Sequence, residues 1–282
     1  MKTMLIPVDF SATTENTIRF ASEWANRFGY NRIILLKTFY DNVFDNIAVS
    51  AEYAPVSQDF RWQERKESTE KLDNMADELS ARFGEGMTVL TAISETPLLR
   101  AINETIREEG VDMVLLGSDN CRSSDNSFIA GNIISIAKIS PVKVLVIPSD
   151  YAYRPVRDVL LPCDYRVMHN LAKLNDPKDA AMAKDVQLHV LNVDAKERYL
   201  NPDEDFKNLE AHLHSYLQNF KHDINYSNEK NIIDGIIKYT NVNDFQLIIS
   251  LPGKHSFLYY LTNKSISEAL CRNSKVPVMI LK

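Results

Sequence analysis

Glycine is scarce in this chain, with eight residues among 282 where about 7% is usual. A loop that cradles phosphate groups needs closely spaced glycines, because a side chain blocks the approach of the backbone to the ligand. Neither G-x-G-x-x-G nor G-x-x-x-x-G-K-[ST] occurs in the sequence. The lack of both motifs disfavours a Rossmann dehydrogenase and a P-loop nucleotide hydrolase.

Cysteine and long apolar runs are also in short supply. Cys121, Cys163 and Cys271 are widely spaced and form no C-x-x-C pair, so neither a disulfide framework nor a zinc site is indicated. No apolar run approaches the roughly 18 residues that span a bilayer, and the first ten residues lack a signal-peptide core. We therefore expect a cytoplasmic protein with no membrane partner.

An excess of positive charge is absent as well. Residues 1–150 carry 15 Lys and Arg against 22 Asp and Glu, and residues 151–282 carry 17 against 16. Neither half has the basic surface typical of nucleic-acid binders. We expect no nucleic-acid partner.

An internal repeat is the most informative feature that is present. Met4–Ser11 (MLIPVDFS) resembles Val159–Arg166 (VLLPCDYR), and each is a short apolar strand that ends in Pro-x-Asp. A second apolar run ends 29 residues after the aspartate in both copies, at Ile33–Thr38 and Leu188–Val193. The equal spacing indicates two copies of one fold.

The two copies also end alike, on the β-branched runs Val142–Pro148 and Val276–Lys282. These ends predict two domains, residues 1–150 and residues 151–282.

Short apolar runs alternate with helical patterns in both halves. Ser11 is placed to cap the first helix, which Gly29 ends. Strands that are nearly continuous in apolar residues are buried on both faces, which is typical of a parallel sheet with helices on each side. The predicted class is α/β, with two repeated open five-stranded parallel-sheet domains.

The first helix of the second half is interrupted. Pro177 falls in the middle of the equivalent segment, so we expect that helix to begin with Asp176 as its N-cap. The residues before it, Tyr165–Asn175, become a loop or a single turn.

Ligands of open α/β sheets bind at the carboxyl ends of the strands. Asp9 and Asp164 lie at such ends, and the segment Tyr40–Asp59 is predicted to pass over the same edge of the first half. Asp9 has two readings that remain open: an Asx-type cap that ties the strand-to-helix turn together, or a ligand for a ribose hydroxyl.

Taken together, the two Pro-x-Asp strands, the LLKT and LNV runs, VLLGSDN and SPVKVLVIP resemble a tandem, two-domain member of the universal stress protein family. The resemblance covers nearly the whole chain. It implies a Rossmann-like fold of the adenine-nucleotide α-hydrolase-like type, and a role in the stress response.

Some members of that family bind ATP through G-x2-G-x9-G-[ST], and others lack the motif and do not bind. The first half keeps Gly117 but has Asn120 at the second glycine position. A gap-free alignment puts Ala130 at the third, and a one-residue insertion gives Gly131-Asn132 instead. The resemblance makes these the candidate nucleotide-binding residues: Pro7, Val8, Asp9, Thr38, Gly117, Asn120, Gly131 and Asn132.

The second half departs further, with Leu251, Lys254 and Lys264 at the three glycine positions and only Ser265 surviving. We expect no ATP there. A separate hypothesis is a small-anion site, because lysines near a helix N-terminus attract anions. Its candidate residues are Asp164, Lys254, His255, Lys264 and Ser265.

Other constellations are weak. His212, His214 and His222 are interpreted as surface residues of one helix, and His189 as a packed core residue on a strand. Cys121 lacks a histidine partner, so a nucleophilic role is not supported. No metal site and no catalytic residue is predicted.

The sequence therefore favours a non-catalytic binding or sensing module with degraded nucleotide-binding motifs. The alternatives are an ATP-binding protein, with slow ATPase activity at most, through the first domain, and an interaction scaffold with both crevices empty. No cofactor is certain, and ATP is possible in the first domain. The last strands, Val144–Ile147 and Val278–Leu281, are apolar enough to pair with each other within one chain, and a homodimer is possible.

Overall fold

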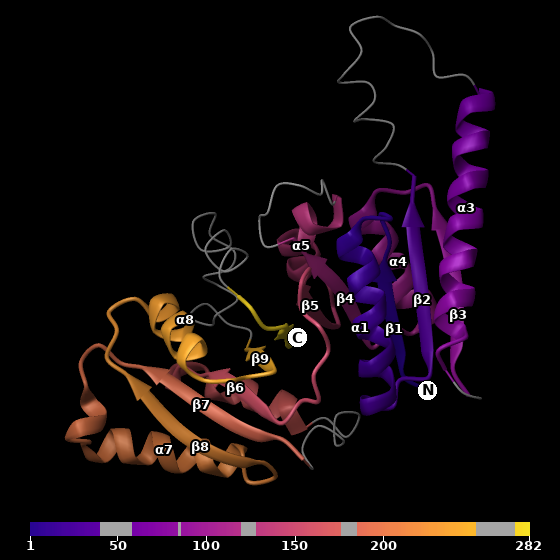
Figure 1. The fold of residues 1–282 in the computed structure, drawn as a ribbon. Helices are drawn as coiled ribbons and strands as arrows, with labels where there is room; N and C mark the ends of the chain where they lie inside the picture. Colours follow the sequence, from indigo (N-terminus) through magenta and orange to yellow (C-terminus); the bar gives the residue numbers. More distant parts are fainter. Residues whose placement is uncertain (40–57, 84–85, 120–127, 176–184, 252–273) are drawn as a thin grey trace, which may run out of the picture. The chain divides into compact units, whose positions relative to one another are not determined.

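The computed structural model describes residues 1–39, 58–83, 86–119, 128–175, 185–251 and 274–282 (Figure 1). The chain divides into two compact units. The first holds Met1–Gly117 with Asp125–Val142, and the second holds Ser118–Ser124 with Lys143–Lys282. The predicted excursion 40–59 lies almost entirely outside the described residues, and the predicted domain boundary near residue 150 stays a prediction.

The first unit is built on parallel strands in the order β3-β2-β1-β4. Their bounds are β1 (Thr3–Pro7), β2 (Arg32–Thr38), β3 (Thr88–Ser94) and β4 (Met113–Ser118). The central strands β1, β2 and β4 are almost wholly buried, as their continuous apolar sequences predict.

Helices join these strands, and they are α1 (Ala12–Phe28), α3 (Gln58–Ser80), α4 (Leu98–Glu109) and α5 (Phe128–Ile139). Helix α1 contacts α3, and α4 contacts α5. This pairing follows from right-handed crossovers, because the strand order reverses its direction of growth after β3. The topological switch point therefore lies between β1 and β4, where ligands of such sheets bind.

The ends of α1 confirm the predicted signals. The side chain of Ser11 accepts a hydrogen bond from the Thr14 amide, and Gly29 adopts the left-handed conformation with φ 68°. Trp24 lies on the buried face, only 1% exposed. The cap and the apolar stripe together fix how α1 leaves β1, which positions the residues at the end of that strand.

The second unit has the strand order β5-β10-β9-β6-β7-β8. Strand β10 pairs antiparallel with β5, and the remaining pairs are parallel. The bounds are β5 (Lys143–Pro148), β6 (Asp158–Pro162), β7 (Gln187–Val193), β8 (Lys221–Ser227), β9 (Leu247–Ser250) and β10 (Val278–Ile280).

Two α-helices of this unit lie on opposite faces of the β6–β7–β8 sheet, α7 (Glu204–Tyr216) and α8 (Ile232–Val242) (Figure 1). A 3₁₀ segment, η1 (Tyr165–Asn175), follows β6 and contacts α7, and a short 3₁₀ turn, η3 (Arg198–Leu200), follows β7. The predicted α/β class with parallel sheets is thus confirmed. Among the described residues, no helix is long and apolar enough to cross a membrane.

Two local expectations need correction. The segment Tyr165–Asn175 forms 3₁₀ structure over its whole length, where a loop or single turn was expected. His222 belongs to β8, because α7 ends at Tyr216 and a turn closed by the Phe220 amide on the Leu217 carbonyl separates the two elements.

Candidate functional site

The carboxyl edge of the first unit is organised around Asp9, which follows β1. One carboxylate oxygen accepts hydrogen bonds from the Ser11 amide (3.2 Å), the Ser11 hydroxyl (2.6 Å) and the Thr14 hydroxyl (2.6 Å). The other oxygen accepts from the backbone amide of Ile129 at 3.2 Å. Asp9 therefore ties the β1–α1 turn together and reaches across to a second helix.

The contact with Ile129 has an electrostatic consequence. Ile129 is the second residue of α5, so the Asp9 carboxylate lies at the N-terminus of that helix. Free amide groups and the helix dipole make such an end a site for anions. In the first unit the protein's own carboxylate already occupies this position.

Gly117 has a structural reason to be glycine. A Cβ atom built at Gly117 would lie 2.5 Å from Thr13 Cγ2 and from Thr17 Oγ1, and 2.8 Å from the Thr13 carbonyl oxygen. The close approach of α1 to β4 thus requires glycine, whether or not a nucleotide binds.

The other candidate residues of the first unit lie along the same edge. The Val8 amide donates to the Leu36 carbonyl at 2.8 Å, which continues the β1–β2 ladder, and Thr38 is 8% exposed at the end of β2. Gly131 and Asn132 are the fourth and fifth residues of α5, and Pro7 ends β1. Asn120 lies outside the described residues. A nucleotide-binding role for this set stays a prediction.

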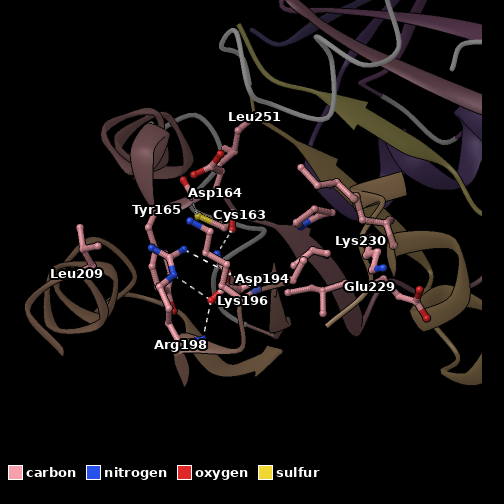
Figure 2. A pocket seen from close by; sticks show the side chains of 17 residues that line it. Cys163, Asp164, Tyr165, Asp194, Lys196, Arg198, Leu209, Glu229, Lys230 and Leu251 are labelled. Carbon is pink, nitrogen blue, oxygen red and sulfur yellow. Dashed lines mark hydrogen bonds and ion pairs between the residues drawn. The ribbon is translucent and has the colours of Figure 1, made fainter. Parts of the chain in front are cut away.

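In the second unit the equivalent edge holds a cavity of about 420 Å³, shown in Figure 2. Strands β6, β7 and β9 end at it, and α8 begins beside it. Its apolar lining includes Val193, Ile232, Ile236 and Leu251. The volume and the mixed lining match those of small-molecule sites in proteins.

Two lining residues that could ionise are held neutral. Burial, together with the neighbouring Asp164 carboxylate, raises the pKa of the Cys163 thiol to about 12. Burial also raises the pKa of Tyr165 to about 12, and the Tyr165 hydroxyl lies 2.8 Å from that of Tyr226. Neither group is a nucleophile near neutral pH, because the thiolate and the phenolate are the reactive forms.

Asp194, which follows β7, is ionised and internally paired. Burial tends to raise its pKa, but hydrogen bonds from the side chain and backbone of Arg198 and from the Lys196 amide outweigh burial, so the pKa is lowered. The Arg198 Nε atom lies 3.0 Å from the carboxylate, and Figure 2 shows the pair at one wall of the cavity. Asp194 therefore fixes the loop after β7 instead of facing a ligand.

Asn192 is the lining residue with an unmet hydrogen bond. Its Nδ2 donates to the Cys163 carbonyl at 2.9 Å, while its Oδ1 is buried with no partner. The side chain is held at the ends of β6 and β7, and the residue is 7% exposed. A buried acceptor without a donor costs free energy, so it marks a place where a donor group would be stabilised.

Of the residues predicted for an anion site, the described part of the chain contains only Asp164, which lines the cavity. Lys254, His255, Lys264 and Ser265 lie outside the described residues. Sequence reasoning missed Asn192, Asp194, Arg198 and Lys230. The position of Asn192 and Asp194 at the end of the second apolar run was the available clue.

The described histidines match their predicted roles only in part, since His212 and His214 are exposed as expected. His189 is not a packed core residue: its Nε2 lies 3.0 Å from Asp158 and its Nδ1 lies 2.9 Å from Asp223, so it bridges β6, β7 and β8. His214 Nδ1 and His222 Nε2 are 2.7 Å apart across α7 and β8. Within the described ranges, no group of three or more potential ligands could hold a metal ion.

The fold and the site define an open, mostly parallel α/β protein, with a cavity at the carboxyl edge of the second unit's sheet. Residues 1–148 match the model of the universal stress protein family, and the chain belongs to this family. None of the curated proteins matches the chain.

Solved structures resemble all or half of the chain at low identity. A universal stress protein from Archaeoglobus fulgidus DSM 4304 superposes with a TM-score of 0.64 at 15% identity, covering 99% of this chain and 96% of that one. A putative universal stress protein from Pseudomonas aeruginosa UCBPP-PA14 has a TM-score of 0.57 at 12% identity, covering 100% of this chain and 93% of that one. A universal stress protein in complex with cAMP has a TM-score of 0.35 at 16% identity, covering 53% of this chain and 98% of that one. The first two likenesses show the same fold over the full length.

Proposed function

We propose that this protein is a non-catalytic binding or sensing module of the stress response, acting in the cytoplasm, whose ligand enters the cavity of the second unit. One observation carries the proposal: the anion position of the first unit is filled by Asp9, whereas the second unit keeps an open cavity with a free acceptor. The neutral Cys163 and Tyr165 in that cavity support binding over catalysis.

The alternative is ATP binding through the first unit. Two features disfavour it: the Asp9 carboxylate at the start of α5 would repel a phosphate group, and residues 1–150 carry a net charge of −7. We expect ATP to bind the full chain more weakly than about 100 μM, on the order of −5 kcal/mol.

Isothermal titration of the full chain with ATP tests this alternative. Micromolar binding that Asp9→Ala abolishes would overturn the proposal for the first unit. For the second unit, the test is an apolar fluorescent probe, N-phenyl-1-naphthylamine, whose binding should disappear when Ile232→Trp fills the cavity. The control is Ile139→Trp, at an exposed position of the first unit.

We further propose that the two repeats of the sequence, residues 1–150 and 151–282, form an intramolecular pseudo-dimer through their last strands, β5 and β10. The register of this antiparallel pair, with Val278 opposite Val146 and Ile280 opposite Val144, supports it. Val146→Pro removes a ladder donor from the paired strand and should lower the free energy of unfolding by on the order of 3 kcal/mol. Ala152→Pro, at an exposed position before β6, is the control; an equal effect of both variants would contradict the proposal.

A further inference from the structure

The charges that line the second unit's cavity are not evenly paired. Asp194 is bound by Arg198, and Glu229 is bound by Lys238, whose Nζ lies 2.6 Å from the carboxylate. Each carboxylate therefore has its own cation. Asp164 also has an interaction partner of its own.

Two cations at the cavity remain without a carboxylate. Lys196 and Lys230 both line it, and within the part of the chain that the structure describes neither ammonium group has a hydrogen-bond or ion-pair partner. Lys230 precedes Asn231, the N-cap of α8, so the positive end of the helix dipole lies beside it. Among the described lining residues, the ammonium groups of Lys196 and Lys230 are therefore the ones available to an acidic group of a ligand.

The interior of this cavity is apolar, in contrast to its charged rim. Ile236 and Leu251 are each 1% exposed, and Val193 and Ile232 add further apolar surface. Gly235 lets α8 approach β7 closely: a Cβ there would lie 3.1 Å from the methyl groups of Val193. The cavity thus joins an apolar interior to a cationic rim, with the buried Asn192 Oδ1 between strand ends as a lone acceptor.

We propose that the cavity of the second unit binds a small organic monoanion, with an apolar body against Ile236 and Leu251 and an acidic group near Lys196 and Lys230. This inference rests on the proposed function, since it names the ligand class of the same cavity. A polyanion such as a nucleoside triphosphate suits the site less well, because Asp164 and Glu229 also line it.

Two probes of nearly the same shape test the proposal on the full chain. 8-Anilinonaphthalene-1-sulfonate carries one negative charge and an N–H group, and N-phenyl-1-naphthylamine is its uncharged counterpart. The double variant Lys196→Gln/Lys230→Gln should weaken the affinity for the sulfonate probe at least tenfold. It should change the affinity for the neutral probe less than twofold. Lys207→Gln/Lys275→Gln removes the same charge elsewhere on the second unit and should leave both probes unchanged.

The outcomes separate the two proposals. If Lys196→Gln/Lys230→Gln weakens both probes equally or neither, the monoanion inference is wrong, although binding in the cavity stands. If Ile232→Trp leaves both probes bound as in the wild type, the cavity is not the site and the proposed function itself is overturned.

Discussion

Both units have a strand that ends in Pro-x-Asp at the carboxyl edge of the sheet, but the surroundings of the aspartate differ. In the first unit, hydroxyl and amide groups donate hydrogen bonds to Asp9, and its carboxylate occupies the anion position at the N-terminus of α5. In the second, Arg166 and His169 stand where the first has Ser11 and Thr14, so the hydroxyl donors are gone. A 3₁₀ segment follows Asp164 in place of a capped helix, and a cavity remains.

This comparison shows that an aspartate at a strand end is not in itself a binding residue. The donors that surround it decide whether its charge is used within the fold or is available to a ligand.

The largest expected effect concerns the glycines that let a helix approach each sheet. Gly117→Ala places a Cβ 2.5 Å from Thr13 and Thr17, and we expect a loss of about 2–3 kcal/mol. Gly235→Ala meets only side chains at 3.1 Å or more and gains helix propensity, so its net cost should stay below about 1 kcal/mol.

Urea unfolding measures this difference. Both tryptophans of the chain, Trp24 and Trp62, lie in the first unit, so their fluorescence reports on that unit while circular dichroism reports on both. Equal destabilisation by Gly117→Ala and Gly235→Ala would contradict the tighter packing assigned to the first unit.

The next effect isolates the role of Asp9. Asp9→Asn keeps the shape of the side chain but replaces one accepting oxygen with a donor, so it should lower the free energy of unfolding of the first unit by about 1–3 kcal/mol. Tryptophan fluorescence during urea unfolding is the measurement. Asp77→Asn removes the same charge from an exposed position on α3 and should change the free energy of unfolding little. If Asp77→Asn lowers it as much as Asp9→Asn does, the hydrogen bonds of Asp9 are not the cause.

The smallest effect concerns acid stability in the second unit. Burial would raise the pKa of Asp223, but hydrogen bonds from Asn225 and Gln187 and the interaction with His189 outweigh it, and the pKa is lowered from 3.8. A lowered folded-state pKa stabilises the protein above about pH 4, and this contribution is lost as the pH falls through the folded value. The difference in stability between wild type and Asp223→Asn should therefore shrink below about pH 4.

Circular dichroism during urea unfolding, repeated from pH 7 to pH 3, measures that difference. Asp77→Asn, at an exposed position on α3, is the control. A difference between wild type and Asp223→Asn that grows as the pH falls below about 4 would have the wrong sign and would refute the assignment.

Much of the fold was predictable because its determinants are local or periodic. The cap at Ser11, the stop at Gly29 and the buried parallel strands all follow from residues adjacent in the sequence. The boundary between α7 and β8 was missed, since His222 sits in a polar stretch with no clear period. His189 was misjudged because its two aspartate partners come from neighbouring strands, and their register is not visible in the sequence.

The sequence by itself determined the α/β class, the repeated strand-ending motif and the family, because each depends on residue type and spacing along the chain. The tertiary structure alone decided that Asp9 accepts a hydrogen bond at the start of α5, since Ile129 lies 120 residues from Asp9. It also decided that, among the described residues, Lys196 and Lys230 have no ion-pair partner at the cavity, and it left the Asn192 acceptor buried beside them. These depend on distances between distant segments, which packing sets and local propensity does not.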